Sequence, residues 1–235
     1  MYDPITASHY SAYRPPFHSV ILGRALRQQK KRQMGLDIGC GTGRSAQELA
    51  KFCSHVVGLE PSKSMLLKAK KHKNVNYVNS PGEQIPIATT SVDVVTLAGS
   101  LNYIERNSLV NELLRICRAD AEIVVYDFEV DLTNFEKFLG INLANYSPEY
   151  DHSANLSEPL NFDEVTIVED EISTTASPME IAHLILSDRE RHNVLCEKYE
   201  ISNPEKLIQN EISSISETIS FRSNIFYSVY SLLQI

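Results

Sequence analysis

The sequence predicts an α/β fold built on a mostly parallel sheet. Three observations lead to it: short apolar runs that read as strands, helical patterns between those runs, and a C-terminal stretch rich in β-branched and aromatic residues. Strands that alternate with helices indicate βαβ units and therefore a parallel sheet. A length of 235 residues favours one sizeable domain with insertions rather than two domains.

The expected elements follow one another along the chain. Strands are expected at 34–39, 55–60, 75–79, 91–99 and 121–128, with helices in SAQELAKF, KSMLLKAKKH and SLVNELLRICRA. Beyond residue 129 the pattern loosens, with breaks at Pro148 and Pro159, and predicts a lid-like insertion around 130–160 over the strand ends. A strand in FDEVTIVEDEIST, one or two helices over 177–199 and a terminal edge strand in ETISFRSNIFYSVYSLL complete the series.

Composition narrows the class of protein. A net charge of −8 disfavours a dedicated duplex-binding protein, and the basic run Arg24, Arg27, Lys30, Lys31 and Arg32 is most simply a solvated helix end. The four cysteines lack metal-ligand spacing, so no metal site is expected. No signal-like or membrane-spanning segment is apparent, and a cytoplasmic chain with no membrane partner is expected.

The stretch LDIGCGTG carries the strongest signal. Gly39, Gly41 and Gly43 stand between an expected strand and an expected helix, where missing Cβ atoms allow backbone to approach a ligand closely. Arg44 occupies the place of the last glycine in a dinucleotide GxGxxG, and no P-loop lysine follows. Glu60 ends the next strand about 20 residues later, where a carboxylate can bind both hydroxyls of a ribose.

These motifs resemble the class I methyltransferases that use S-adenosylmethionine. LDIGCGTG is similar to their first motif, GLEPS to the acidic loop, SPGEQIP and SVDVV to the stretch around the adenine, and LLRICRADAEIVVYDF to the helix and fifth strand. YSAYRPPF and SVDVVTLAGSLNYI resemble the trans-aconitate methyltransferase-like, or methyltransferase type 11, branch. The resemblance implies a Rossmann-like, mostly parallel seven-stranded sheet with helices on both faces and an antiparallel C-terminal strand. It further implies a cofactor-covering segment over 1–33 and a methyltransferase domain over 34–235.

The resemblance also implies S-adenosyl-L-methionine as cofactor, S-adenosyl-L-homocysteine as product, and a set of cofactor-binding residues. Asp37 and the glycines would face the methionine part, Glu60 the ribose and Met65 the adenine, while Arg14 could pair with the cofactor's carboxylate. The full set is Tyr10, Tyr13, Arg14, Asp37, Gly39, Cys40, Gly41, Gly43, Glu60, Pro61, Met65, Gly82, Glu83, Ala98, Gly99 and Ser100.

The branch has His-Trp after the fourth strand, where this chain has Asn102 and Tyr103. A carboxylate acceptor is ionised at neutral pH and needs no base, so the missing histidine favours O-methylation of a small carboxylate. The catalytic candidates are Asn102, Tyr103 and His152, and the other six histidines form no constellation. The leading hypothesis is methyl transfer to a small-molecule acceptor, with no nucleic acid as partner. The alternatives are a methyltransferase for tRNA or protein and a non-catalytic S-adenosylmethionine-binding module.

Overall fold

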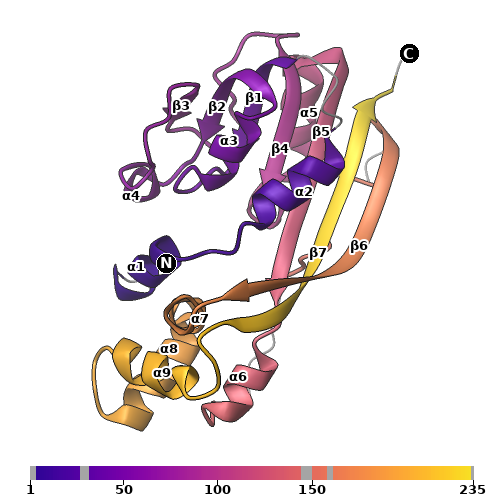
Figure 1. Cartoon of the computed structure of the whole chain (residues 1–235). Coiled ribbons are helices and arrows are strands. Elements are labelled where there is room, and N and C mark those ends of the chain that lie inside the picture. Colours follow the sequence, from indigo (N-terminus) through magenta and orange to yellow (C-terminus); the bar gives the residue numbers. More distant parts are fainter. Residues whose placement is uncertain (1–3, 27–31, 144–149, 158–160, 234–235) are drawn as a thin grey trace. The chain divides into compact units, whose positions relative to one another are not determined.

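The protein is described by a computed structural model covering residues 4–26, 32–143, 150–157 and 161–233 (Figure 1). Its strands form one seven-stranded sheet in the order β3-β2-β1-β4-β5-β7-β6. The strands are β1 (Arg32–Ile38), β2 (Cys53–Leu59), β3 (Val75–Val78), β4 (Val92–Ala98), β5 (Cys117–Val130), β6 (Phe162–Ala176) and β7 (Ile219–Leu232). The alternation of apolar runs and helical patterns therefore predicted the fold class correctly.

The sheet is parallel except for its C-terminal strand. β1 pairs in parallel with β2 and β4, β2 with β3, and β4 with β5. Two backbone bonds connect opposite ends of β7 to its neighbours: the Asp131 N–H donates to the Arg222 carbonyl, and the Leu233 N–H to the Asn161 carbonyl. β7 thus runs antiparallel to β5 and β6, as the arrows in Figure 1 also show.

The chain divides into two compact units, where its length alone favoured a single core. The sheet unit comprises 16–128, 150–170 and 225–235, and the helical unit comprises 1–15, 129–149 and 171–224. β5, β6 and β7 have residues in both units. That residues 1–33 cover the cofactor and that residues around 130–160 form a lid stay predictions. The two predicted breaks, Pro148 and Pro159, lie outside the described residues.

In the sheet unit the central strands are buried on both faces, as the continuous apolar runs of a parallel sheet require. Figure 1 shows α2 and α3 in front of the strands and α5 behind them. The helices of this unit are α2 (Phe17–Ala25), α3 (Arg44–Leu49), α4 (Lys63–Leu66), the 3-10 turn η1 (Leu101–Tyr103) and α5 (Arg106–Ile116). On α5, Leu109, Leu113 and Ile116 face the core beside strand residues such as Leu36 and Val95.

Two local predictions in the sheet unit are wrong. The stretch KSMLLKAKKH forms only the four-residue α4, because this helix has no buried residue to pack and short unpacked helices are marginal in water. Arg32 is not part of a solvated helix end: it opens β1, is 2% exposed, and its guanidinium bonds the Glu122 carboxylate on β5. Arg27, Lys30 and Lys31 lie outside the described residues.

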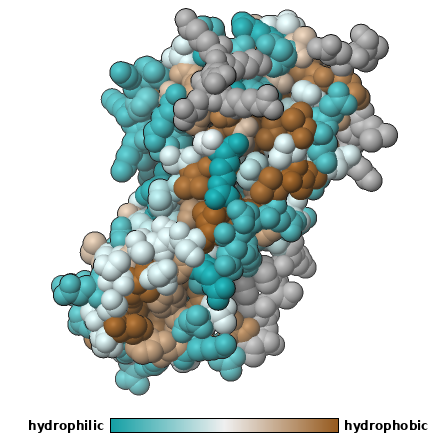
Figure 2. All heavy atoms as spheres, turned by 45° about the vertical axis from the view of Figure 1, so that its right-hand side comes forward, coloured by the Kyte–Doolittle hydropathy of each residue, from teal (hydrophilic) through white to brown (hydrophobic). Residues whose placement is uncertain are grey.

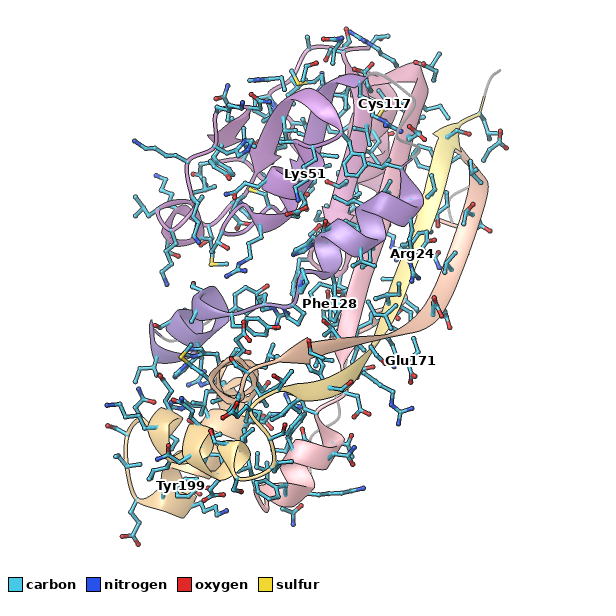
Figure 3. All side chains as sticks on the ribbon, viewed as in Figure 1. Arg24, Lys51, Cys117, Phe128, Glu171 and Tyr199 are labelled. Atoms are coloured by element: carbon cyan, nitrogen blue, oxygen red, sulfur yellow. The ribbon has the colours of Figure 1, made fainter. Side chains whose placement is uncertain are left out.

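The helical unit contains α1 (Pro4–Ala12), α6 (Thr133–Phe138), α7 (Pro178–Leu186), α8 (Arg189–Tyr199) and α9 (Glu205–Ser213). α7 packs against α1, α8 and α9, and its Ile181, Leu184 and Ile185 are buried. Tyr199 of α8, labelled in Figure 3, donates to the Glu211 carboxylate of α9 at 2.7 Å. Sequence reasoning expected neither α1 nor α9.

The strand β6 forms one edge of the sheet. Five exposed carboxylates lie along it: Asp163, Glu164, Glu169, Asp170 and Glu171. Exposed apolar Val165 and Ile167 stand among them, and Figure 2 shows hydrophilic residues next to hydrophobic ones on the side of the molecule that is turned forward. Arg24, labelled in Figure 3, pairs with Asp170 at 2.8 Å.

No helix in the described ranges is long and apolar enough to cross a membrane. All four cysteines are free thiols, and three of them are buried.

Candidate cofactor and acceptor site

The loop after β1 requires its three glycines. Gly39, Gly41 and Gly43 all have positive φ, at +74°, +54° and +83°, in the region that favours glycine. A Cβ on Gly39 would collide with Ser100, and one on Gly43 would collide with the Tyr77 hydroxyl. Backbone conformation disfavours a side chain at all three glycines, and close packing adds to this at Gly39 and Gly43. The loop therefore presents bare backbone at the carboxyl end of β1.

Asp37 lies beneath this loop with its side chain fully buried. Ser45 Oγ donates to one carboxyl oxygen at 2.5 Å, and Thr96 Oγ1 donates to the other at 2.7 Å. Burial raises the pKa of Asp37 to about 6, while these two hydrogen bonds act in the opposite direction. The group is therefore a buried carboxyl whose charged form a nearby cation would stabilise.

Glu60 joins the glycine loop to the loop after β2. The Gly41 N–H donates to Glu60 Oε2 and the Ser62 N–H to Oε1, each at 2.9 Å. A carboxylate has about four acceptor positions, so two remain for further donors. Asn79 fixes the same turn by donating to the carbonyls of Glu60 and Pro61 at 2.9 and 2.8 Å.

Several other predicted cofactor residues surround this edge of the sheet unit. Met65 lies next to the glycine loop, with its Cε 3.4 Å from where a Cβ on Gly41 would stand. Cys40 is buried with its sulfur over Gly58, so only its backbone faces the loop. Ser100 Oγ donates to the Ile38 carbonyl at 2.6 Å, which ties the end of β4 to β1.

Gly82 and Glu83, which were predicted to border the adenine, contact other residues of the chain. Gly82 is buried where a Cβ would meet Ile38 and Ile104 at 3.0 Å. Glu83 Oε1 accepts the Glu105 N–H at 2.9 Å, just before α5 begins. Tyr10, Tyr13 and Arg14 belong to the helical unit, so their contact with a cofactor stays a prediction.

A second cluster surrounds Gly99 at the end of β4. Tyr150 donates its hydroxyl to the Gly99 carbonyl at 2.7 Å, and its ring is 4.8 Å from the ring of His152. His152 Nδ1 is 2.9 Å from Asp127 Oδ2. Because a carboxylate only accepts hydrogen bonds, Nδ1 carries the hydrogen and Nε2 is the ring nitrogen that can take a proton.

The three predicted catalytic residues lie in this cluster. Asn102 Nδ2 donates to the Asp151 carbonyl at 2.8 Å, next to His152. The Tyr103 side chain is 77% exposed, and its ring centroid is 5.9 Å from that of Tyr150. His152 also lines a small pocket of about 60 Å³ with Phe226, Tyr126 and neighbours from β6. The structure therefore brings Asn102, Tyr103 and His152 together around Tyr150.

Sequence reasoning missed Asp127 and Tyr150. Asp127 stands at the carboxyl end of the fifth expected strand, so the rule that ligands bind at strand tails could have identified it. Tyr150 lies in the loosely patterned insertion, where the sequence has no periodic signal that points to it.

Comparison with known proteins agrees with this geometry. Residues 36–125 match the family model described as "Methyltransferase domain". A Saccharomyces cerevisiae protein named as a probable S-adenosylmethionine-dependent methyltransferase is 26% identical over 145 residues, which cover 57% of this chain and 50% of that protein. The demethylmenaquinone methyltransferase of Corynebacterium kroppenstedtii is 33% identical over 94 residues, covering 40% and 41% of the two chains.

A solved structure shares the fold over almost the whole chain. It is described as a putative type II methyltransferase from Anaeromyxobacter dehalogenans, with a TM-score of 0.67, 20% identity, and coverage of 93% of this chain and 97% of that one. The aligned part of this chain spans about half or less of the two curated relatives. Residues 36–125 thus match a methyltransferase domain model, and the chain has the Rossmann-like fold of that solved structure.

Proposed function

We propose that this chain, whose residues 36–125 match a methyltransferase domain, is a class I methyltransferase that transfers the methyl group of S-adenosylmethionine to a small-molecule acceptor. The observation that carries the proposal is the bare glycine loop held between the two carboxyl groups of Asp37 and Glu60. The domain family and the fold agree with it.

The residues of this loop fit the proposed cofactor. The buried Asp37 carboxyl, with its pKa raised to about 6 by burial, would be stabilised in its ionised form by the ammonium of a methionine moiety. The remaining lone pairs of Glu60 suit the two hydroxyls of a ribose. When bound, S-adenosylmethionine supplies a methyl group activated by the adjacent sulfonium. The protein's task is then to hold the acceptor atom in line at about 3 to 3.5 Å and to exclude water.

The acceptor atom can be proposed more narrowly. The sequence favours a carboxylate oxygen, because a histidine is missing directly after β4. Against this, His152 with Asp127 forms a candidate base beside Tyr150, the residue bonded to Gly99. A hydroxyl or amine must lose a proton during methyl transfer, and a positioned imidazole can accept it. We therefore propose an acceptor that carries such a proton, with the carboxylate as the alternative.

Methylation of tRNA or protein has little support in the described residues. A basic run could offer cations to a nucleic acid, but in the run from Arg24 to Arg32 Arg24 pairs with Asp170 and Arg32 is buried against Glu122.

Transfer of a labelled methyl group from S-adenosylmethionine into cell extract tests the proposal. The products are separated into small-molecule and macromolecular fractions, with Glu60→Ala protein as the blank. We expect label in the small-molecule fraction with the wild-type chain only. Label in RNA or protein contradicts the small-molecule proposal, and tight cofactor binding without any transfer contradicts the enzymatic one.

A panel of hydroxy compounds, amines and carboxylic acids, assayed with wild-type and His152→Asn protein, tests the nature of the acceptor atom. A general base contributes about 10² or more to the rate. We expect a loss of that size with hydroxyl or amine acceptors. Transfer to carboxylic acids alone, unaffected by the substitution, favours the carboxylate alternative.

A further inference from the structure

A cluster of metal-ligating side chains lies in the helical unit. His9 Nδ1 of α1 is 2.9 Å from His183 Nδ1 of α7, and 3.8 Å from Glu205 Oε2 at the start of α9. The three ligand atoms all lie within 4.8 Å of one another. The expectation that these histidines form no constellation is wrong, because residues separated by up to 196 positions in the sequence meet where the three helices pack.

We propose that His9, His183 and Glu205 bind a divalent metal ion of the zinc type. Two imidazoles and one carboxylate are a ligand set that Zn²⁺ takes, with three protein ligands and the fourth position left to water. Ligands at 2.0–2.1 Å around a tetrahedral ion stand about 3.3 Å apart. The separations of 2.9 and 3.8 Å lie on either side of that value, so small side-chain shifts admit the ion.

The surroundings fit this assignment. His9 is 3% exposed, whereas His183 and Glu205 are half-buried, so the cluster is enclosed on one side and open on the other. A carboxylate with two neutral imidazoles carries one negative charge, so the site with a divalent cation bound has a net charge of +1. His192 of α8 is buried nearby, with its ring centroid 6.2 Å from that of His9.

The ion would tie α1 to α7 and α9. α1 has nine residues, a length at which a helix depends on tertiary contacts rather than on its own propensity. Metal binding to a preformed site adds its binding free energy to the stability of the folded state. The three ligands lie in the helical unit and none of them is a proposed cofactor or acceptor residue, so metal binding can be tested without S-adenosylmethionine.

The competing interpretation is a neutral histidine pair in which one Nδ1–H donates to the other Nδ1. To distinguish the two interpretations, the protein is freed of metal with a chelator and dialysed against Zn²⁺. The amount of Zn²⁺ bound per chain is then measured. We expect one Zn²⁺ per wild-type chain and at least tenfold weaker binding in His183→Ala and in Glu205→Gln. His55→Ala, a half-buried histidine of the sheet unit, is the matched control and should bind as the wild type does.

Two further readouts keep the proposal testable if a variant folds poorly. Co²⁺ in place of Zn²⁺ should give the visible absorption of a tetrahedral site in the wild type and in His55→Ala, and lose it in Glu205→Gln. Zn²⁺ should raise the Tm of the wild type but not of His183→Ala. Absence of bound Zn²⁺ in the wild type, or equal binding by the wild type and both ligand variants, overturns the site.

Discussion

His152 Nδ1 lies 2.9 Å from Asp127 Oδ2, which sets the imidazole with its hydrogen on Nδ1 and its proton-accepting nitrogen at Nε2. His152 comes from the loop after residue 149 and Asp127 from the carboxyl end of β5. The pair has the form in which a carboxylate orients a histidine base.

Asp127→Asn tests whether this carboxylate positions the base. Asparagine can donate to Nδ1 and so favour the wrong tautomer, and we expect kcat to fall by at least about tenfold with hydroxyl acceptors. The KM for S-adenosylmethionine should hardly change. Steady-state kinetics of Asp127→Asn and His152→Asn measure both constants. If Asp127 acts through His152, the double variant should be no slower than His152→Asn alone. A change in the cofactor's KM with unchanged kcat would contradict the positioning role.

Glu60→Ala should weaken binding of S-adenosylmethionine by at least about tenfold, or roughly 1.4 kcal/mol. The substitution removes the acceptors for the ribose and also those for the Gly41 and Ser62 N–H groups. Isothermal titration calorimetry measures the affinity, with the exposed edge residue Asp163→Ala as control. Unchanged affinity would remove the ribose assignment.

Asp37 makes stability depend on pH in a defined direction. Burial raises its pKa from 3.8 to about 6 in the folded chain, so between these values the folded state binds a proton that the unfolded state has lost. The free energy of unfolding therefore falls as the pH rises from about 4 to 6, by about 3 kcal/mol from this group.

The variant Asp37→Asn cannot ionise. In cofactor-free protein we expect the difference in free energy of unfolding, variant minus wild type, to increase by about 3 kcal/mol between pH 4 and 7, because only the wild type is destabilised by ionisation of Asp37. Urea unfolding followed by circular dichroism at several pH values measures the difference, and Asp163→Asn should show no such trend. A constant difference across this range would mean that Asp37 does not titrate there.

Two glycines should respond oppositely to alanine. Gly43 has a φ of +83° and no room for a Cβ beside Tyr77, so Gly43→Ala should destabilise the chain by about 1 kcal/mol or more. Gly23 is exposed within α2 with no atom within 4 Å of a Cβ, so Gly23→Ala should stabilise it by about 0.5–1 kcal/mol. Thermal melts compare both variants with wild type, and a shift in the same direction for both would contradict this account.

The elements of the central sheet were predictable because parallel strands buried on both faces have a simple apolar signature. The meeting of the glycine loop with Glu60 was predictable from the spacing of these residues, because it depends on a local turn and the adjacent strand. Their contact with a cofactor stays a prediction. α4 was overpredicted because its helical pattern has nothing to pack against. His9 and His183 could not be paired from the sequence, because their contact depends on how α1 and α7 pack.

The long edge strand β6 has a consequence for how the protein behaves at high concentration. Unpaired backbone groups on such an edge can recruit the same edge of another molecule, and charged side chains oppose this. Of the five carboxylates along β6, Asp170 and Glu171 pair with Arg24 and Arg222. The exposed Asp163, Glu164 and Glu169 add the negative charge that repels a second copy. High salt screens these charges, which leaves the exposed Val165 and Ile167 less protected. Buffers of high ionic strength should therefore promote β-type self-association, and storage or crystallisation at low ionic strength should keep the chains apart.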